Sequence, residues 1–432
     1  MRISLRRRAG TARAVALLAA VALAGVAGCS GGGGSADEGT DVTVWHGYTD
    51  AEAEALTAQA KEWNAAHPTE KVNLVFNGGN DNALQKTVAG FTAGNYPDVA
   101  YEFGSSVSPL SRQPKLVDLT ERVKAPDVRW DDFFVAERDA GTVDGKVVGV
   151  PALVDNLALV YNKDLFAKAG VAEPTESWSW QDFRDAAKRL SDPATKTFGW
   201  AYVNDGSEDT VWRYLAMLWQ AGGDLLTADN TKPAFDSPAG LAALQQLKDM
   251  AVTDKSVYLD QGNQNYLNLF NAGQVGMLWT GPWDLSSVNS DVRYGVTLLP
   301  GYRGDHQTIA GPDLYLLFDH SGAKTDTAWK FVTWLTSAEV HLRFAIATGD
   351  LPLRKSETEL PDYRKFLEKY PGNAVFVKNL DNVKHARPNV PTYGQISTAI
   401  GQMVQSVLLG RAEPQQALDT ARDEVTSALA GS

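Results

Sequence analysis

Two polar residues interrupt an apolar run in the first half of the sequence. Asp155 and Asn156 lie within residues 147–161, a stretch that otherwise reads as buried strand. A buried carboxylate or amide is unfavourable unless it finds a hydrogen-bonding partner. The side chains of Asp155 and Asn156 therefore need hydrogen-bonding partners from outside this strand.

Aromatic side chains are abundant, with 12 tryptophans and 14 tyrosines. Flat rings suit the apolar faces of sugar rings, while acids and amides suit sugar hydroxyls. Most of the tryptophans read as core residues. Trp283 differs because it follows the turn pair Gly281-Pro282 directly after a strand. This position predicts a platform for a ligand.

No common catalytic motif is visible. Beyond the first forty residues, the sequence contains no Gly-x-Ser-x-Gly, His-Glu-x-x-His, P-loop or Gly-x-Gly-x-x-Gly pattern, and its six histidines lack metal-ligand spacing. We therefore expect no enzyme activity, no cofactor and no metal. A glycosidase with two carboxylates facing each other stays open as an alternative.

The first forty residues resemble an export and anchoring segment. Five arginines precede a short apolar stretch at 14–23, which ends in Val26-Ala27-Gly28-Cys29. This ending looks like a bacterial lipobox, and Cys29 is the only cysteine. We predict a lipoprotein signal peptide at 1–28, lipidation of Cys29, a flexible Gly/Ser-rich tether at 29–40 and anchoring on the extracytoplasmic face of the membrane. A plain secretory signal with an incidental cysteine is the alternative, and the sequence leaves Sec and twin-arginine export open.

The charge of the mature chain argues against nucleic acid as a partner. Removing five arginines and no acid leaves 35 basic and 52 acidic residues, a formal charge of −17. Binding to nucleic acid needs a basic surface.

Periodicity predicts an α/β protein. Strands at 41–45, 71–76 and 97–103 alternate with helices at 50–66 and 82–93, as in a mostly parallel sheet. Thr49-x-x-Glu52 reads as a capping box. Asn162 and Gly170 read as the caps of a helix at 163–169. Further helices are expected at 178–190, 210–221, 238–251, 328–335, 339–348, 396–409 and 414–429, with strands near 278–279, 294–299 and 314–318.

Four segments carry a resemblance to a known family. They are GKVVGVPALVDNLALVYNKDLFAKAG (145–170), FNAGQVGMLWTGPWDL (270–285), AWKFVTWLTSAEV with ATGDLPLR (328–354), and LLGRAEPQQALDTA (408–421). With the lipobox, they resemble the family 1 extracellular solute-binding proteins, the group that includes maltose- and trehalose-binding proteins of ABC importers.

The resemblance implies a periplasmic-binding-protein fold with two α/β lobes and a ligand cleft between them. Lobe 1 is expected at 41–152 and 309–355, and lobe 2 at 153–308 and 356–432. Asp155 would sit where the chain crosses between lobes and would face the cleft. The alternative for Asp155 is a cap on a backbone amide at the crossover.

The same resemblance suggests the ligand-binding residues. They are Tyr48, Asn80, Asp81, Glu102, Asp155, Trp212, Trp283, Gly311, Asp313, Asp350 and Arg387. Gly311-Pro312-Asp313 departs from the double glycine common in the family. Trp212 would be a second ring platform beside Trp283, and Gly311 would lend its backbone N–H.

The acids in this set outnumber its one base, so we expect a neutral mono- or oligosaccharide and not a phosphate. The partners implied are the sugar and the permease subunits of an ABC transporter in the membrane, with the protein itself a monomer. The Trp45-His46 and Tyr101-Glu102-x-Gly104 stretches also look like receptors for glycerol 3-phosphate or glycerophosphodiesters, which is the main alternative. A surface glycosidase and a polysaccharide-adhesion lipoprotein are further alternatives.

Overall fold

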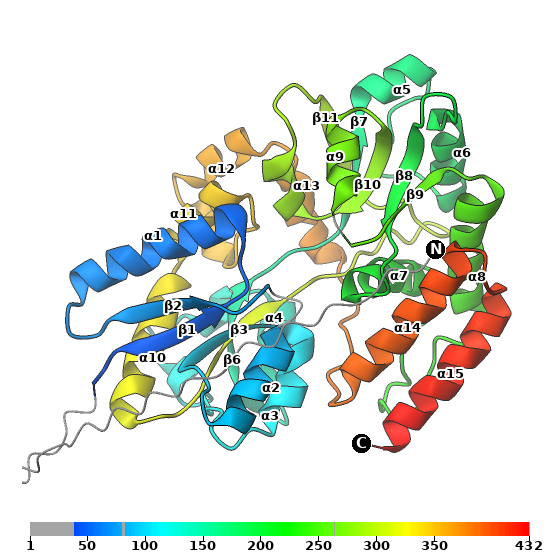
Figure 1. Cartoon of the computed structure of the whole chain (residues 1–432). Helices are drawn as coiled ribbons and strands as arrows, with labels where there is room; N and C mark the ends of the chain where they lie inside the picture. The colour runs from blue at the N-terminus through cyan, green and yellow to red at the C-terminus, as the bar shows by residue number, and fades with distance from the viewer. Residues whose placement is uncertain (1–38, 80–82, 263, 432) are drawn as a thin grey trace, which may run out of the picture. The chain divides into compact units, whose positions relative to one another are not determined.

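The computed structural model describes residues 39–79, 83–262 and 264–431. Gly39–Ser432 form one compact unit, whose strands make two five-stranded sheets (Figure 1). Both sheets are flanked by helices, as predicted.

The first sheet has the strand order β2-β1-β3-β12-β6. Its strands are β1 (Val42–His46), β2 (Val72–Phe76), β3 (Val99–Phe103), β6 (Gly149–Leu153) and β12 (Asp313–Leu317). β1 pairs in parallel with β2 and β3, whereas β12 runs antiparallel to β3 and β6. Two of the four pairings are thus parallel and two are antiparallel, so the sheet is mixed and not mostly parallel.

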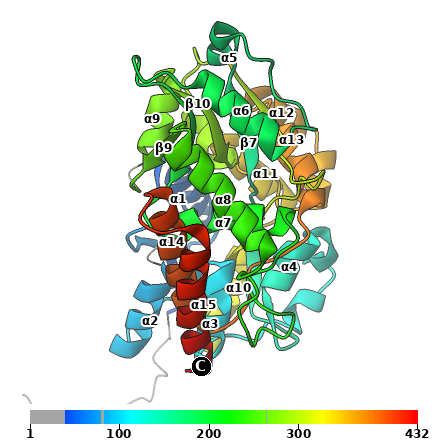
Figure 2. The same cartoon turned by 90° about the vertical axis from the view of Figure 1, so that its right-hand side faces the viewer.

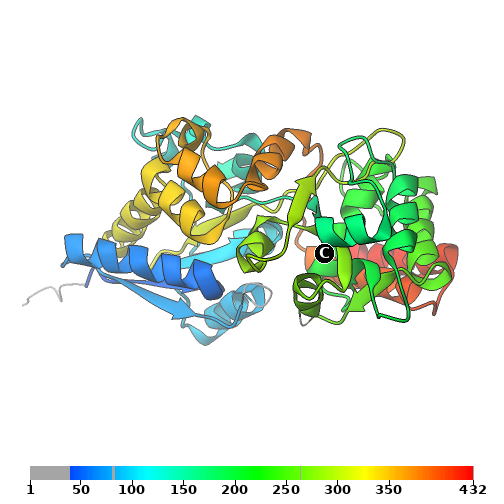
Figure 3. The same ribbon diagram turned by 90° about the horizontal axis from the view of Figure 1, so that it is seen from above.

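Helices cover both faces of the first sheet. They are α1 (Asp50–Ala66), α2 (Ala83–Ala93), α3 (Val107–Ser111), α4 (Val135–Ala140), α10 (Gly322–Leu335), α11 (Ala338–Thr348) and α12 (Tyr363–Lys369), with a small hairpin of β4 (Thr142–Val143) and β5 (Lys146–Val147). Along β3, Tyr101 belongs to the core under α1 and α10, and Ala100 to the core under α2 and α3. Seen from above, the blue α1 lies next to the yellow α11, and the two helices are in contact (Figure 3).

The second sheet has the order β11-β7-β10-β8-β9. Its strands are β7 (Ala158–Asn162), β8 (Phe198–Val203), β9 (Val257–Asp260), β10 (Val275–Thr280) and β11 (Tyr294–Thr297). The remaining helices are α5 (Lys163–Ala169), α6 (Trp180–Leu190), α7 (Glu208–Gln220), α8 (Pro238–Lys248), α9 (Asn265–Asn271), α13 (Asn373–Asn379), α14 (Tyr393–Leu408) and α15 (Pro414–Ala430). The red α14 and α15 pack side by side, and both contact α8 (Figure 2).

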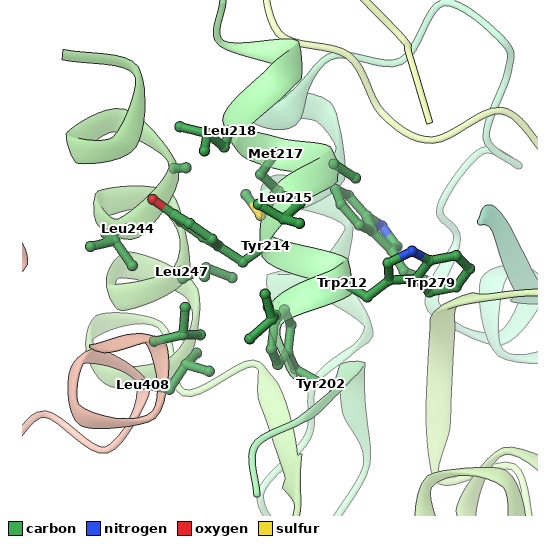
Figure 4. Close-up of a cluster of buried hydrophobic side chains, with 14 of the residues drawn as sticks. Tyr202, Trp212, Tyr214, Leu215, Met217, Leu218, Leu244, Leu247, Trp279 and Leu408 are labelled. Atoms are coloured by element: carbon green, nitrogen blue, oxygen red, sulfur yellow. The ribbon is translucent and has the colours of Figure 1, made fainter. Parts of the chain in front are cut away.

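α7 is the central helix of the second core. Every residue from Thr210 to Gln220 is buried. Tyr214 and Leu218 belong to the same apolar core as Leu244 of α8 and Leu408 of α14 (Figure 4). Trp212, at the N-terminal end of the helix, is thereby held in a fixed place.

Several local predictions can be compared with the structure. α1 has the predicted bounds, Asn162 caps α5 by accepting from the Asp164 and Leu165 N–H groups, and Gly170 ends α5 at φ 61°. The predicted capping box at Thr49 is wrong, because the Thr49 side chain makes no capping hydrogen bond.

The apolar run at 147–161 is two strands and not one. β6 ends at Leu153 in the first sheet and β7 begins at Ala158 in the second. Between them Asn156 pairs with Ala310 of the returning segment, donates to the Phe376 carbonyl oxygen at 2.9 Å and accepts from Asn379 at 3.0 Å. Both polar atoms of the buried Asn156 side chain are therefore hydrogen-bonded, and these bonds join the segments that cross between the sheets.

Among the residues that the structure describes, no helix has the length and hydropathy needed to cross a membrane. Within the same residues, no group of three or more His, Cys, Asp or Glu side chains is placed to hold a metal ion.

Candidate ligand-binding cavity

A cavity of about 810 Å³ is lined by residues from both sheets and their helices. Tyr101 and Phe103 of β3 line it, as does Asp313 at the start of β12. Trp212 of α7 and Trp283, which follows β10, line it from the second sheet.

The cavity collects most of the predicted binding residues. Those that line it are Asp155, Trp212, Trp283, Gly311, Asp313, Asp350 and Arg387. Asn80, Asp81 and Cys29 lie outside the described residues. Tyr48 and Glu102 are placed elsewhere.

Glu102 faces away from the cavity because side chains alternate along a strand. Its neighbours Tyr101 and Phe103 line the cavity, while Glu102 points to the opposite face, where Thr87 of α2 donates to its Oε1 at 2.6 Å. Burial raises the pKa of this fully buried carboxyl to about 8. The sequence reasoning selected the correct strand end but the wrong face.

Tyr48 lies beneath the cavity wall. It is 1% exposed, and its ring packs against Tyr101 with a centroid distance of 4.4 Å and against Phe344 at 5.8 Å. Tyr48 therefore supports Tyr101, and Tyr101 is the tyrosine that lines the cavity.

Asp155 reaches the cavity beside a glycine that makes room for it. The Gly311 N–H donates to the Asp155 carbonyl oxygen at 3.2 Å. A Cβ at position 311 would lie 2.4 Å from Asp155 Oδ1 and 3.1 Å from Trp212 Cζ2. Asp155 Oδ1 is buried with no hydrogen-bond partner among the described residues. Burial, followed by the charge of Asp313, raises the pKa of Asp155 well above its usual value.

Asp313 and Asp350 add two more buried carboxyl groups. Asp313 accepts a hydrogen bond from the Tyr101 hydroxyl, and burial raises its pKa to about 7. Burial likewise raises the pKa of Asp350 to about 6, and its Oδ2 is buried without a described partner. The half-buried Glu52 of α1 lines the same wall, and burial raises its pKa well above the usual range. We call Glu52, Asp155, Asp313 and Asp350 the carboxyl wall.

The indole rings of Trp212 and Trp283 form a second feature of the cavity lining, beside the carboxyl wall. The rings of Trp212 and Trp283 have centroids 5.7 Å apart and planes inclined by 37°. Trp283 is the second residue of the 3-10 helix Pro282–Ser287, and its ring folds back over Gly281, where a Cβ would lie 1.8 Å from the ring. Glycine at 281 is therefore a condition for the ring position.

Arg387 lies in an irregular segment before α14, and its side chain is 8% exposed. Its Nη1 donates to Glu208 Oε1 at 3.0 Å. Burial works against the charge of Arg387, but the neighbouring Glu208 carboxylate, with Tyr393 and Asp313, raises its pKa above the usual value.

Sequence reasoning missed part of the lining. The missed residues include Glu52, Glu208, Asp209, Tyr266, Asp284, Tyr294 and Tyr370. Glu208 and Asp209 begin α7, where acids are common because they favour the helix dipole. Asp284 had a usable signal, since it follows the singled-out Trp283. It is buried and accepts hydrogen bonds from Thr280 at 2.5 Å and Tyr266 at 2.9 Å.

Comparison with known proteins gives consistent likenesses. A family model described as bacterial extracellular solute-binding protein matches residues 48–341. The sn-glycerol-3-phosphate-binding periplasmic protein UgpB of Pectobacterium atrosepticum is 25% identical over 414 residues, which cover 89% of this chain and 90% of that protein.

Two solved structures are similar in fold and sequence. The cyclic alpha-maltosyl-1,6-maltose binding protein of Arthrobacter globiformis has a TM-score of 0.76 and 29% identity, covering 91% of this chain and 99% of that one. Maltose-bound MalE3 of T. maritima has a TM-score of 0.80 and 26% identity, and the match covers 90% of this chain and 99% of that one.

Proposed function

The chain belongs to the bacterial extracellular solute-binding proteins, and we propose that it is a lipid-anchored receptor that captures a neutral mono- or oligosaccharide for an ABC importer. The family is extracellular and UgpB is periplasmic, so the protein acts outside the cytoplasm. Solute-binding proteins deliver their ligands to permeases, and the permease subunits are the proposed membrane partner.

One observation carries the saccharide proposal: the paired indoles and the carboxyl wall line the same cavity. Indole faces cover the C–H surfaces of sugar rings, and carboxyl groups exchange hydrogen bonds with hydroxyls. A hydrogen bond to a charged group contributes about 1.5–3 kcal/mol. The two similar structures named above are a cyclic alpha-maltosyl-1,6-maltose binding protein and a maltose-bound protein, which supports the same ligand class.

A glycerol phosphate or glycerophosphodiester is the second candidate, favoured by the likeness to UgpB over most of the chain. The basic groups of the cavity lining are already engaged, which disfavours it. The Arg387 guanidinium donates to Glu208, and Lys369 donates to the Ile346 carbonyl oxygen at 2.8 Å. Any carboxyl group of the wall that is ionised would also repel a phosphate.

We further propose that the two sheets are the cores of two lobes that close on the ligand, with the predicted bounds 41–152 with 309–355 and 153–308 with 356–432 changed at one point. α12 lies beyond residue 355 but contacts α11 and belongs with the first sheet, so the first lobe extends past 355 through α12. The hinge would be residues 151–156, where the chain passes from β6 towards β7.

Isothermal titration of the purified protein with maltose, trehalose, cellobiose and glycerophosphocholine tests the ligand class. We expect at least one saccharide to bind and glycerophosphocholine not to bind. The Asp155→Asn and Trp283→Ala variants should lose affinity, whereas Trp329→Phe, a substitution outside the cavity lining, should retain it. Binding of glycerophosphocholine alone would replace the proposal with the second candidate.

The proposal includes no chemistry on the ligand. Chromatography of a bound oligosaccharide after long incubation should recover it intact; hydrolysis that the Asp155→Asn variant abolishes would establish a glycosidase. A protein that bound insoluble glucan but no small sugar would be an adhesion lipoprotein.

The lipid anchor is tested separately because Cys29 lies outside the described residues. Metabolic labelling with a fatty acid should label the wild type and not the Cys29→Ser variant, which should be released from membranes. Retention of the unlabelled variant on membranes would contradict anchoring through Cys29.

A further inference from the structure

Glu208 is a residue of the cavity wall that the sequence analysis did not predict. It is the first residue of α7, and its carboxylate accepts three hydrogen bonds. Arg387 Nη1 and the Tyr393 hydroxyl donate to Oε1 at 3.0 and 2.7 Å, and the Ser397 hydroxyl donates to Oε2. Arg387 comes from the segment before α14, and Tyr393 and Ser397 come from the start of α14 itself.

Arg387 needs such a partner for two reasons. It lies outside helices and strands, so no regular backbone fixes the direction of its side chain. Its guanidinium is also largely buried, and a buried charge is unfavourable without a counter-charge. Glu208 supplies that charge from the first turn of α7, a helix whose position is fixed because its residues from Thr210 to Gln220 are buried in the second core.

Other carboxyl groups compete for the same cation. Asp155 and Asp313 both interact electrostatically with Arg387, and so does Glu137 of α4, a buried residue outside the cavity lining. If Arg387 turned towards Asp155 or Asp313, it would occupy oxygen atoms of the carboxyl wall. The bond with Glu208 therefore decides which acids stay available to a ligand.

We propose that Glu208 is a positioning residue that holds Arg387 on the α7 side of the cavity and thereby leaves Asp155 and Asp313 to accept ligand hydroxyls. This assignment rests on the saccharide function proposed above. The Tyr393 and Ser397 hydroxyls complete the clamp, because they fix both carboxylate oxygens of Glu208 and tie the start of α14 to it.

The test is a double-mutant cycle on saccharide affinity with E208Q, R387Q and the double variant. Glutamine keeps the length of Glu208 and an acceptor oxygen but removes the charge. E208Q should bind the saccharide about tenfold more weakly, since a charge-assisted hydrogen bond becomes a neutral one. In the R387Q background, adding E208Q should change affinity by less than about twofold, because the residue through which Glu208 acts is gone. E176Q, which removes the exposed partner of Lys378, is the matched control and should bind as the wild type does.

Unchanged affinity in E208Q, or equal losses with and without Arg387, would overturn the assignment. A second readout does not need a ligand: carbon-13 NMR of the ligand-free protein should show the Asp313 titration moving to lower pH in E208Q, because the released guanidinium approaches Asp313. An unmoved titration would also overturn it.

If the wild type bound no saccharide, the proposed function would fail, while this titration of Asp313 would still decide the role of Glu208. S397A removes one of the three donors to Glu208 and no charge, and should move the Asp313 titration less far in the same direction. If E208Q does not fold, S397A takes its place, and an unmoved Asp313 titration in S397A would refute the clamp.

Discussion

Replacing Asp313 with asparagine is expected to stabilise the ligand-free protein above neutral pH. Asp313 is 4% exposed, and burial raises its pKa from 3.8 to about 7, although the Tyr101 hydroxyl and Arg387 oppose the shift. The folded protein therefore keeps this proton at pH values where the unfolded chain releases it. Its contribution to the free energy of unfolding is fully present below pH 4 and is lost as the pH rises through 7.

The magnitude follows from the shift. A rise from 3.8 to about 7 amounts to about 4 kcal/mol, at about 1.4 kcal/mol per pKa unit. Asparagine carries no charge and avoids this loss, while its oxygen can still accept from Tyr101. Its amide N–H₂ replaces a carboxyl oxygen and costs about 1–3 kcal/mol if it finds no acceptor. We expect a net gain of about 2 kcal/mol at pH 8 and, because only the amide cost remains, a net loss of about 1–3 kcal/mol at pH 4.

Urea unfolding monitored by circular dichroism between pH 4 and pH 8 measures this difference. Asp350, whose pKa burial raises to about 6, contributes to the slope of both proteins. Its charge also helps to raise the pKa of Asp313, so the difference between the two profiles measures Asp313 together with this coupling. The control is Asp326→Asn, which removes an exposed partner of Arg122 and should parallel the wild type. Parallel profiles of Asp313→Asn and the wild type would show that Asp313 carries no charging cost and would refute the electrostatic account of the carboxyl wall.

The other predictions concern ring position and close approach in the cavity. Trp283→Ala should weaken saccharide binding about tenfold by calorimetry, because ring contacts add about 0.5–1.5 kcal/mol beyond burial. Gly281→Ala should give a comparable loss without removing the ring, since its Cβ would lie 1.8 Å from the Trp283 indole; wild-type affinity would mean that the ring position does not matter. Gly311→Ala should also weaken binding in the same assay, because its Cβ would lie 2.4 Å from Asp155 Oδ1. Gly322→Ala, which meets nothing within 4 Å, is the control for both glycine variants and should bind normally.

The parts of the fold that could be predicted have a clear local signal. α1 is a long helix with its expected bounds, and Asn162 and Gly170 are the residue types that cap helices. β8 (Phe198–Val203) lacks such a signal, and no strand was predicted there. Five of its six residues are buried, so FGWAYV shows no alternation of polar and apolar residues, and an apolar run of this length does not distinguish a strand from a helix.

The residues of the cavity likewise divide into those with a local sequence signal and those without one. Trp283 and Asp155 could be selected because each is unusual where it stands, one on a turn and one in an apolar run. Glu102 was selected without knowledge of which face of β3 is turned to the cavity, and a shift of one residue changes the face. Glu52 and Glu208 were missed because an acid in the first turn of a helix has an ordinary local explanation. Only tertiary contacts distinguish that explanation from a role in the cavity.

The division of chemistry between the two sheets has a consequence for binding. Asp313 and Glu52 belong to the first sheet and its helix α1, whereas the two indoles and Glu208 belong to the second sheet and its helices. A ligand that contacts both indoles and the carboxyl groups of Asp313 and Glu52 must therefore contact both halves. Hydrogen bonds to the carboxyl wall also strengthen as water leaves the cavity, because the local dielectric falls. If the proposed lobes close on the ligand, affinity depends on how closely the sheets approach. We therefore expect Asn156→Ala, a substitution in the crossing segments, to change the affinity measured by calorimetry without touching the ligand.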